Sequence, residues 1–279
     1  MKQTFLIALL LMCTYLAAQT AKPGTTSAQG SAIPGIGAPE GPNGPGYLEF
    51  GGSRSDLTSP QPSWTDAYIR GVLNMTPTNA LSVEADRQAR FGDSGYFGSV
   101  GLTHSFTSNL YTNAYVGTSA GGFFLPKFRF DGFVNYKLLP EKQLVANLGI
   151  GYDKAKTPNS AVRFMPGATY YFSSIPLIIQ GGAQITRANP GSILAKTYNL
   201  AVTEGREKSH YITVRAELGR EAYEVVNVGN TLENFPIHVY SGTWRQWIGM
   251  NWGINFNFER ELNPYYNRNG ATIGVFLDF

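Results

Sequence analysis

Apolar and polar residues alternate with a period of two along most of this chain, in runs of about ten residues. Between Leu81 and Phe91, one face is apolar except at Arg87, and the other carries Ser, Glu, Asp, Gln and Arg. The pattern recurs at 128–138, 143–153 and 251–259. Successive side chains of a strand point to opposite faces, so this period predicts β-strands. Helical periods are scarce, and no segment after the N-terminus has the roughly 18 consecutive apolar residues of a spanning helix.

We expect fourteen strands, or twelve if the first two do not span a membrane. They begin near residues 47, 64, 80, 94, 109, 126, 142, 160, 175, 193, 207, 235, 250 and 269. Every second connection is short, and the others are mostly longer, notably 55–63, 119–125, 221–234 and 262–268. Short turns at one end and longer loops at the other are typical of outer-membrane barrels. The sequence therefore predicts an all-β, antiparallel up-and-down barrel with both termini in the periplasm.

Composition favours this barrel over a soluble β-sandwich, which is the main alternative. Charged residues make up 15% and aromatic residues 13%, whereas soluble domains are about 25% charged. The mean hydropathy is −0.16, as expected where alternate residues of a strand meet lipid and water. Aromatic residues lie near expected strand ends, where interfacial girdles form. A single Cys excludes a disulfide framework and a Cys-rich zinc site, and a net charge of +3 is too small to indicate nucleic-acid binding.

The chain divides into three parts. Residues 1–20 have a basic start, an apolar run and small residues near a cleavage point, which predicts a secretory signal peptide. The single Cys13 lies within it. Residues 21–46 are rich in Gly and Pro and predict a disordered leader. Residues 47–279 form the barrel. Its last strand ends at Phe279 with alternating apolar residues before it, which predicts a recognition signal for the barrel assembly machinery.

The polar face predicts the residues that line the interior. Charges facing lipid cost about 2–4 kcal/mol for Arg or Lys at the midplane, so they are expected to point inward. Basic residues slightly outnumber acidic ones in this set, which favours anionic solutes or sugars if the interior is open. The same charges would otherwise pack the barrel shut. The charged candidates are Arg70, Glu84, Asp86, Arg90, Lys127, Arg129, Asp131, Lys137, Asp153, Arg163, Arg215, Glu217, Arg245 and Glu259, and the aromatic ones are Tyr111, Tyr115, Tyr171 and Tyr211.

Two loops are further candidates for binding. The segment 121–126 includes Phe123 and Phe124 and is unusually apolar for an extracellular loop. It would fold inward as a constriction, enter lipopolysaccharide or bind a partner. The segment 263–270 includes Tyr265, Tyr266 and Arg268, a composition suited to carbohydrate contact. Local turn packing is the alternative for both loops.

An enzymatic function is the weakest alternative. A barrel hydrolase needs a His beside a nucleophile or an acidic residue. His104 and His210 share the parity of lipid-facing residues, which leaves His238, near Glu221, Glu224 and Glu233, as the one credible catalytic candidate. No metal-ligand spacing or phosphate-binding loop is present. We therefore expect a protein that is not an enzyme and has no cofactor or metal.

The block from about Tyr96 to the end resembles the YaiO-type outer-membrane barrel family. The stretches that carry the resemblance are GGFFLP at 121–126 with KFRFDGFVNYKLLPEKQLV, NPGS at 189–192, TEGREKSHYITVRAELGREAYE at 203–224, WRQWIG at 244–249 and NPYYNRNG at 263–270. The resemblance implies an outer-membrane barrel associated with exopolysaccharide or surface-glycan systems. It implies no catalytic residues.

These observations predict a non-enzymatic barrel in the outer membrane of a Gram-negative bacterium, a conduit or accessory for exopolysaccharide or other polar solutes. The first alternative is a closed structural or receptor-like barrel whose loops bind a partner, and the second is an outer-membrane enzyme. Expected partners are membrane lipid and lipopolysaccharide, the barrel assembly machinery, and a polysaccharide or a periplasmic export protein. No nucleic-acid partner is expected.

Overall fold

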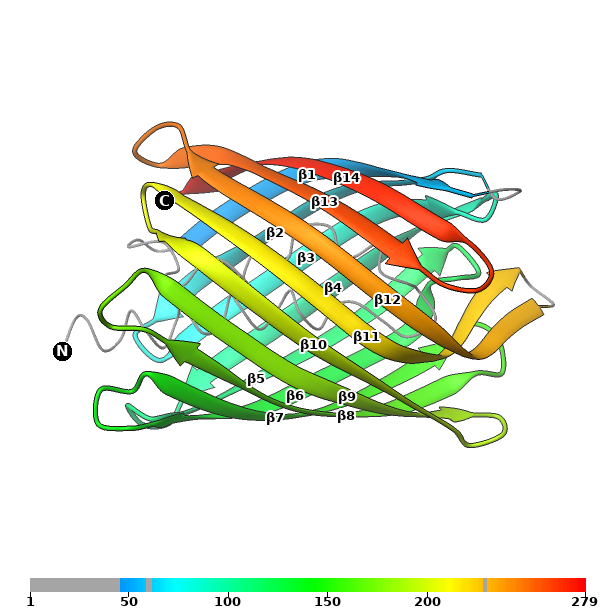
Figure 1. The fold of residues 1–279 in the computed structure, drawn as a ribbon, viewed down its shortest axis with the longest axis horizontal. Coiled ribbons are helices and arrows are strands. Elements are labelled where there is room, and N and C mark those ends of the chain that lie inside the picture. Colours follow the sequence, from blue (N-terminus) through cyan, green and yellow to red (C-terminus); the bar gives the residue numbers. More distant parts are fainter. Residues whose placement is uncertain (1–45, 59–61, 228–229) are drawn as a thin grey trace.

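A computed structural model describes residues 46–58, 62–227 and 230–279, and these form a closed antiparallel barrel of fourteen strands (Figure 1). The predicted signal peptide and nearly all of the predicted leader lie outside the described residues. The strands are β1 (Gly46–Leu57), β2 (Trp64–Thr76), β3 (Asn79–Arg90), β4 (Asp93–Ser105), β5 (Leu110–Gly121), β6 (Pro126–Leu138), β7 (Leu144–Ala155), β8 (Ser160–Tyr171), β9 (Leu177–Asn189), β10 (Ile193–Arg206), β11 (His210–Asn227), β12 (Asn230–Trp247), β13 (Trp252–Leu262) and β14 (Asn267–Asp278).

The barrel closes where the first strand pairs with the last. The β1–β14 register runs from Tyr47 opposite Asp278 to Leu57 opposite Arg268. Gly46 and Phe279 exchange two backbone hydrogen bonds of 3.1 and 3.0 Å at the end of this seam. Closure leaves no strand edge unpaired, which lipid requires because it offers no hydrogen-bond partners. The prediction of fourteen strands is therefore confirmed over the alternative of twelve.

Alternation decides which side chains face outward. Val83, Ile150 and Ile273 are 46, 56 and 62% exposed, while inward-facing Asn135 and Asp153 are fully buried. An outer surface this rich in apolar side chains suits hydrocarbon, and a polar interior suits residues that can bond to one another. No helix in the described part of the chain is long and apolar enough to cross a membrane.

The two ends of the barrel differ less in loop length than expected. We call the end with Gly46 and Phe279 the terminal rim and the opposite end the distal rim. At the terminal rim, the connections have from two residues, as at 77–78, to five, as at 139–143. At the distal rim, they have from two residues, as at 91–92, to six, at 58–63. The prediction of a long loop at 221–234 is wrong, because β11 and β12 extend through it. Loop length therefore does not indicate which rim faces the cell exterior.

The β11–β12 hairpin bends at the distal rim, where Figure 1 shows its end turning away from the direction of the wall. Gly219 has a φ of 152°, and Asn234 has a φ of 47°. A Cβ at position 219 would lie 2.2 Å from the carbonyl oxygen of Lys196, so only glycine fits there. Beyond this bend the alternation of burial stops, and residues 221–225 are all buried. We call the described residues of 221–234 the cap hairpin.

Candidate functional site: the charged interior and its distal cap

The interior is lined by most of the residues that the sequence singles out. The structure places these on the inward face: Arg70, Glu84, Asp86, Arg90, Arg129, Asp131, Lys137, Asp153, Arg163, Arg215, Glu217, Arg245, Glu259, Tyr111, Tyr115, Tyr171 and Tyr211. Lys127 is an exception, because a β-bulge between Pro126 and Phe128 shifts the register and leaves it exposed. A bulge adds one residue to a strand and so reverses the parity on which the prediction depended.

The central group of the terminal half is Glu49, which the sequence analysis missed. Its carboxylate is fully buried and accepts hydrogen bonds from Arg70 at 2.6 Å and Arg245 at 2.9 Å. The Tyr68 hydroxyl and the Asn255 amide also donate to it, at 2.9 and 3.3 Å. A Cβ at Gly51 or Gly274 would collide with the Tyr68 hydroxyl, so these glycines make room for the network.

Aromatic rings complete this terminal cluster. The Arg245 guanidinium lies 3.5 Å from the centre of the Phe276 ring and 5.3 Å from that of Trp247. The Trp247 indole donates a 2.9 Å hydrogen bond to Asp278. Cation–π contacts of this kind stabilise a desolvated guanidinium by about 2 kcal/mol. Arg245 is thus held by a carboxylate and by rings, which fixes its position inside the wall.

The distal half contains two more ion clusters. Arg129 and Arg163 both face Asp131 and Asp153, with Arg163 2.5 Å from Asp131. A Cβ at Gly151 would lie 2.5 Å from the Asp131 carboxylate, so the absence of a side chain there allows the pair to form.

The second distal cluster surrounds Arg268, which bonds to Glu259, Glu261 and Ser55. Charges removed from water are tolerated only when they are paired in this way.

Glu49, Asp66, Glu261 and Asp278 also face inward or are buried in the wall, although none was a predicted lining residue. When they are counted, basic residues no longer outnumber acidic ones among the inward-facing residues, in contrast to the excess predicted from the alternation in the sequence. The missed signal is present in the sequence, since Glu49 lies two residues from inward-facing Tyr47 and Glu261 two residues from Glu259. The expected preference for anionic solutes therefore loses its basis.

The cap hairpin lies over the distal end of this interior. Ala222, Tyr223 and Val225 pack against the inward-facing alanines Ala161, Ala188 and Ala195 of β8, β9 and β10. Phe123, from the connection between β5 and β6, packs against the same cluster. Because β5 and β6 lie on the far side of the barrel from β11 and β12, the cluster as a whole extends across the distal mouth. Small side chains on the wall provide the space that the hairpin fills.

A row of aromatic rings continues the cap across the mouth. Tyr266 lies against Trp64, with ring centres 5.8 Å apart, and Trp64 lies 5.0 Å from Phe91. Phe91 is 6.4 Å from Phe123. Beneath the row, the guanidinium groups of Arg90 and Arg268 lie 5.0 and 5.3 Å from the Trp64 ring. The rings thus separate the buried charges from the distal surface.

Two polar contacts tie the cap hairpin to neighbouring loops. The Tyr266 hydroxyl bonds to both carboxylate oxygens of Glu224, each at 2.9 Å. The Asn159 amide bonds to the Thr231 hydroxyl at 3.3 Å. Lys156 bonds to the backbone carbonyls of Gly121 and Gly122, which holds the Phe123 loop in place. Burial lowers the pKa of the Lys156 ammonium, although Asp93 partly opposes this shift.

The loop candidates therefore take an inward role. Phe124, Tyr266 and Arg268 are 3, 5 and 1% exposed, so they are not available to an external partner. Phe123 is partly buried, and of these five residues only Tyr265 is well exposed, at 52%. Of the alternatives for segment 121–126, the structure has the inward fold. The carbohydrate surface expected at 263–270 is reduced to Tyr265, because Tyr266 and Arg268 point into the barrel.

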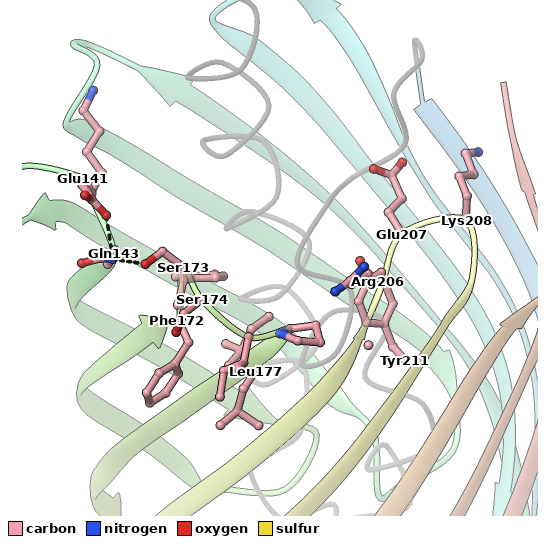
Figure 2. A pocket seen from close by; sticks show the side chains of 16 residues that line it. Glu141, Gln143, Phe172, Ser173, Ser174, Leu177, Arg206, Glu207, Lys208 and Tyr211 are labelled. Atoms are coloured by element: carbon pink, nitrogen blue, oxygen red, sulfur yellow. Dashed lines mark hydrogen bonds between the residues drawn. The ribbon is translucent and has the colours of Figure 1, made fainter.

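A cavity of about 680 Å³ opens at the terminal rim. The turns at 139–143, 172–176 and 207–209 surround it, and inward-facing Tyr171 and Tyr211 contribute to its wall. Figure 2 shows Gln143, bonded to Glu141 and Ser173, on one side, with Arg206 and Tyr211 on the other. Its lining mixes both signs of charge with aromatic surface, a composition suited to a polar ligand of low net charge.

The structure does not support a catalytic arrangement at His238. Its side chain is exposed on the outward face of β12, whereas Glu221 and Glu224 are buried. Among the described residues, no group of three or more His, Cys, Asp or Glu side chains could hold a metal ion. Phe279 is 51% exposed and shares the outward face with Ile273 and Leu277. Its role as an insertion signal stays a prediction.

Comparison with solved structures shows the same architecture. The monoaromatic hydrocarbon channel CymD has a TM-score of 0.58 at 8% identity, covering 85% of this chain and 89% of that one. A bacterial polysaccharide outer membrane secretin has a TM-score of 0.56 at 8% identity, covering 84 and 98%. Omp33 of Acinetobacter baumannii has a TM-score of 0.51 at 13% identity, covering 85 and 100%. At these identities the likeness shows the fold alone, that of an outer-membrane β-barrel.

No curated protein matches the sequence. The family model described as the YaiO membrane beta barrel domain matches residues 46–224, which is more than half of the chain. The match begins at the first strand, well before Tyr96, and stops within the cap hairpin. This protein therefore belongs to the YaiO family of outer-membrane β-barrels.

Proposed function

We propose that this barrel is a non-enzymatic conduit for polar solutes, of which exopolysaccharide is one class, and that the cap hairpin holds its distal mouth closed. The observation that supports this proposal is that the terminal rim has an open cavity, whereas the distal mouth is covered. The terminal rim has a mixed-charge cavity, and the distal mouth is crossed by the cap hairpin and an aromatic row. Fourteen strands enclose more space than the eight that side chains nearly fill.

The lining supports a solute of low net charge. Most inward-facing arginines are paired with carboxylates in the wall, as Arg70 is with Glu49 and Arg163 with Asp131. Paired opposite charges produce only a weak net electric field, so they select poorly between cations and anions. They still offer many hydrogen bonds to hydroxyl groups. At the terminal cavity, Tyr171 and Tyr211 add aromatic surface to this lining. Neutral and uronic-acid oligosaccharides should therefore reduce the ionic current to a similar extent.

Conductance in planar bilayers tests the proposal. The test variant removes residues 222–232 and joins Glu221 to Glu233, which leaves a two-residue connection between the paired Glu221 and Phe235. Two-residue connections are the commonest hairpin turns, so the wall should still close. We expect a low current from the full chain and a stable current, at least tenfold higher, from the variant.

The matched control shortens a connection at the terminal rim, where no cap is present. It replaces residues 106–110, between the paired Ser105 and Tyr111, with Asn-Gly, and none of these residues lines the terminal cavity. This control should leave the current at the level of the full chain. If the cap variant folds, judged by heat-dependent mobility on gels, and still passes no current, the conduit is rejected.

A closed structural or receptor-like barrel is the second candidate. It is favoured by the packing cluster at the distal mouth, which includes the cap hairpin and Phe123 of the β5–β6 connection. This candidate predicts that removing the cap lowers thermal stability without producing a current.

A further inference from the structure

Basic side chains gather on the outward face next to the distal rim. They come from strands distributed around the whole barrel and lie close to the distal ends of those strands. The residues of this basic collar are Arg54, Arg87, Lys127, Lys154, Arg187, Lys196, Arg220 and Arg260. Acidic residues near the same level are few, and Asp56 is paired with Arg54 at 3.2 Å.

The terminal rim is different. Its basic residues, Lys142, Arg206 and Lys208, are accompanied by Glu141, Glu204 and Glu207, and all of these except Glu204 also line the terminal cavity. Lys208 is also bound to Asp278 at 2.7 Å. The two rims therefore differ in charge, although their connections are similar in length. A basic excess at only one membrane interface indicates an anionic leaflet at that interface.

Aromatic side chains show that the collar lies at headgroup depth. Tyr96 is the register partner of Arg87, Phe128 that of Lys154, and Tyr240 that of Arg260. All three rings are exposed on the outward face. Girdle aromatics occupy the interface between headgroups and hydrocarbon. Lipid-facing Arg and Lys cost about 2–4 kcal/mol at the midplane but only about 0–1 near the interface, so this level is where they are tolerated.

The densest part of the collar lies on three adjacent strands. Arg187 of β9 is the register partner of Leu194, which is two residues from Lys196 on β10. Lys196 in turn lies next to the Thr197–Gly219 pair, which brings it beside Arg220 of β11. All three side chains are exposed, and no acidic residue shares their outward face on these strands near the rim. We call Arg187, Lys196 and Arg220 the basic triad.

Like charges on neighbouring strands destabilise a sheet unless a counter-charge is present. The protein supplies only neutral partners: Ser192 for Arg187 at 3.2 Å and Asn234 for Arg220. The side chain of Lys196 has no partner among the described residues. An anion from outside the chain is therefore the missing component, and at this depth the available anions are lipid headgroups.

We propose that the basic triad binds the phosphate groups of a phosphorylated glycolipid in the surrounding leaflet, so that the distal rim is the end that lies in the lipopolysaccharide leaflet. Arginine suits this role because its planar donors match phosphate oxygens in pairs. The proposal is independent of whether the interior conducts.

Binding of lipid A in mixed detergent micelles tests the site. The probe is bis-phosphorylated lipid A, and the comparison is the same lipid with both phosphates removed. We expect the full chain to retain the phosphorylated lipid through purification and to lose the dephosphorylated one, as counted by native mass spectrometry. Inorganic phosphate at millimolar concentration should not displace the lipid. Displacement by free phosphate, or equal retention of both lipids, would overturn the proposal.

Two triple variants with the same change of charge locate the site. The first is Arg187→Gln, Lys196→Gln and Arg220→Gln. The second is Arg87→Gln, Lys127→Gln and Arg260→Gln, which removes collar residues from well-separated strands. We expect at least a tenfold loss of lipid A affinity in the first and less than a threefold loss in the second. Equal losses would mean a diffuse charge effect and would overturn the assignment to the triad.

A conservative variant distinguishes a loss of lipid binding from a loss of folding. Arg187→Lys with Arg220→Lys keeps the charge and loses the paired donor geometry. It should retain the lipid with an intermediate affinity. Heat-dependent gel mobility identical to that of the full chain establishes that each variant has folded, and unchanged lipid A affinity in a folded triad variant contradicts the proposal.

Discussion

The Tyr266 hydroxyl bonds to both carboxylate oxygens of Glu224, each at 2.9 Å, and so joins the β13–β14 connection to the cap hairpin. Both side chains are buried, at 5 and 0% exposure. A hydrogen bond to a charged group contributes about 1.5–3 kcal/mol. This contact is therefore a polar link, shielded from water, between the cap hairpin and a neighbouring loop.

Removing this link should loosen the cap. Tyr266→Phe deletes the hydroxyl but keeps the ring that packs on Trp64. Under the conduit proposal, bilayer recordings should show brief openings several times more often than in the full chain. Tyr265→Phe is the control, because its ring is 52% exposed and its hydroxyl has no bond to another described residue. Identical opening frequencies in the two variants would contradict a latch at Glu224.

Glu49 should be essential for stability. Glu49→Gln leaves Arg70 and Arg245 buried without their counter-charge. Breaking a buried pair by removing one partner costs about 3–5 kcal/mol. Urea unfolding in micelles, followed by tryptophan fluorescence, measures this loss. Asp56→Asn is the matched control, because Asp56 and Arg54 are 69 and 68% exposed and such pairs contribute about 0–1 kcal/mol.

Gly151→Ala should disrupt the Arg163–Asp131 pair. The added methyl group would lie 2.5 Å from the Asp131 carboxylate and 2.6 Å from the Arg163 guanidinium. Part of the roughly 3–5 kcal/mol of a broken buried pair should be lost. The midpoint of urea unfolding should fall accordingly. Gly98→Ala is the control, since the nearest atom to its added methyl group is 3.7 Å away. If the urea midpoint of Gly151→Ala equals that of Gly98→Ala, the Arg163–Asp131 pair does not need the space left by Gly151.

The orientation of the barrel can be measured in intact cells. Ser192→Cys lies at the distal rim, and Ser174→Cys lies at the terminal rim. If the basic collar lies in the lipopolysaccharide leaflet, a membrane-impermeant maleimide should label the first variant and not the second until the outer membrane is opened. The reverse pattern would place the termini outside and would contradict both the predicted topology and the collar proposal.

The strands were predictable because alternation is a local property. Expected starts such as 64, 126, 160 and 193 coincide with observed ones, since turn residues and parity mark each strand without reference to its neighbours. Parity also identified inward-facing Arg163 and Tyr211. It misassigned Lys127, because a bulge changes the count of residues by one. It missed Glu49 because two consecutive glycines, Gly51 and Gly52, weaken the alternation of the first strand.

The cap hairpin was not predictable in this way. Its residues are polar and apolar without a clear period, and such a pattern predicts a loop at 221–234. Contacts with Ala161, Ala188 and Ala195 on three other strands, together with the Tyr266–Glu224 hydrogen bonds, hold it over the mouth.

By itself, then, the sequence determined the barrel, its strand number and most of its lining, because each depends on the alternation of side chains along a single strand. Which charges pair, which loops turn inward and which rim carries the basic collar were decided only by the tertiary structure. Those features depend on distances between residues such as Glu224 and Tyr266, which lie far apart in the chain and come together only when the barrel closes.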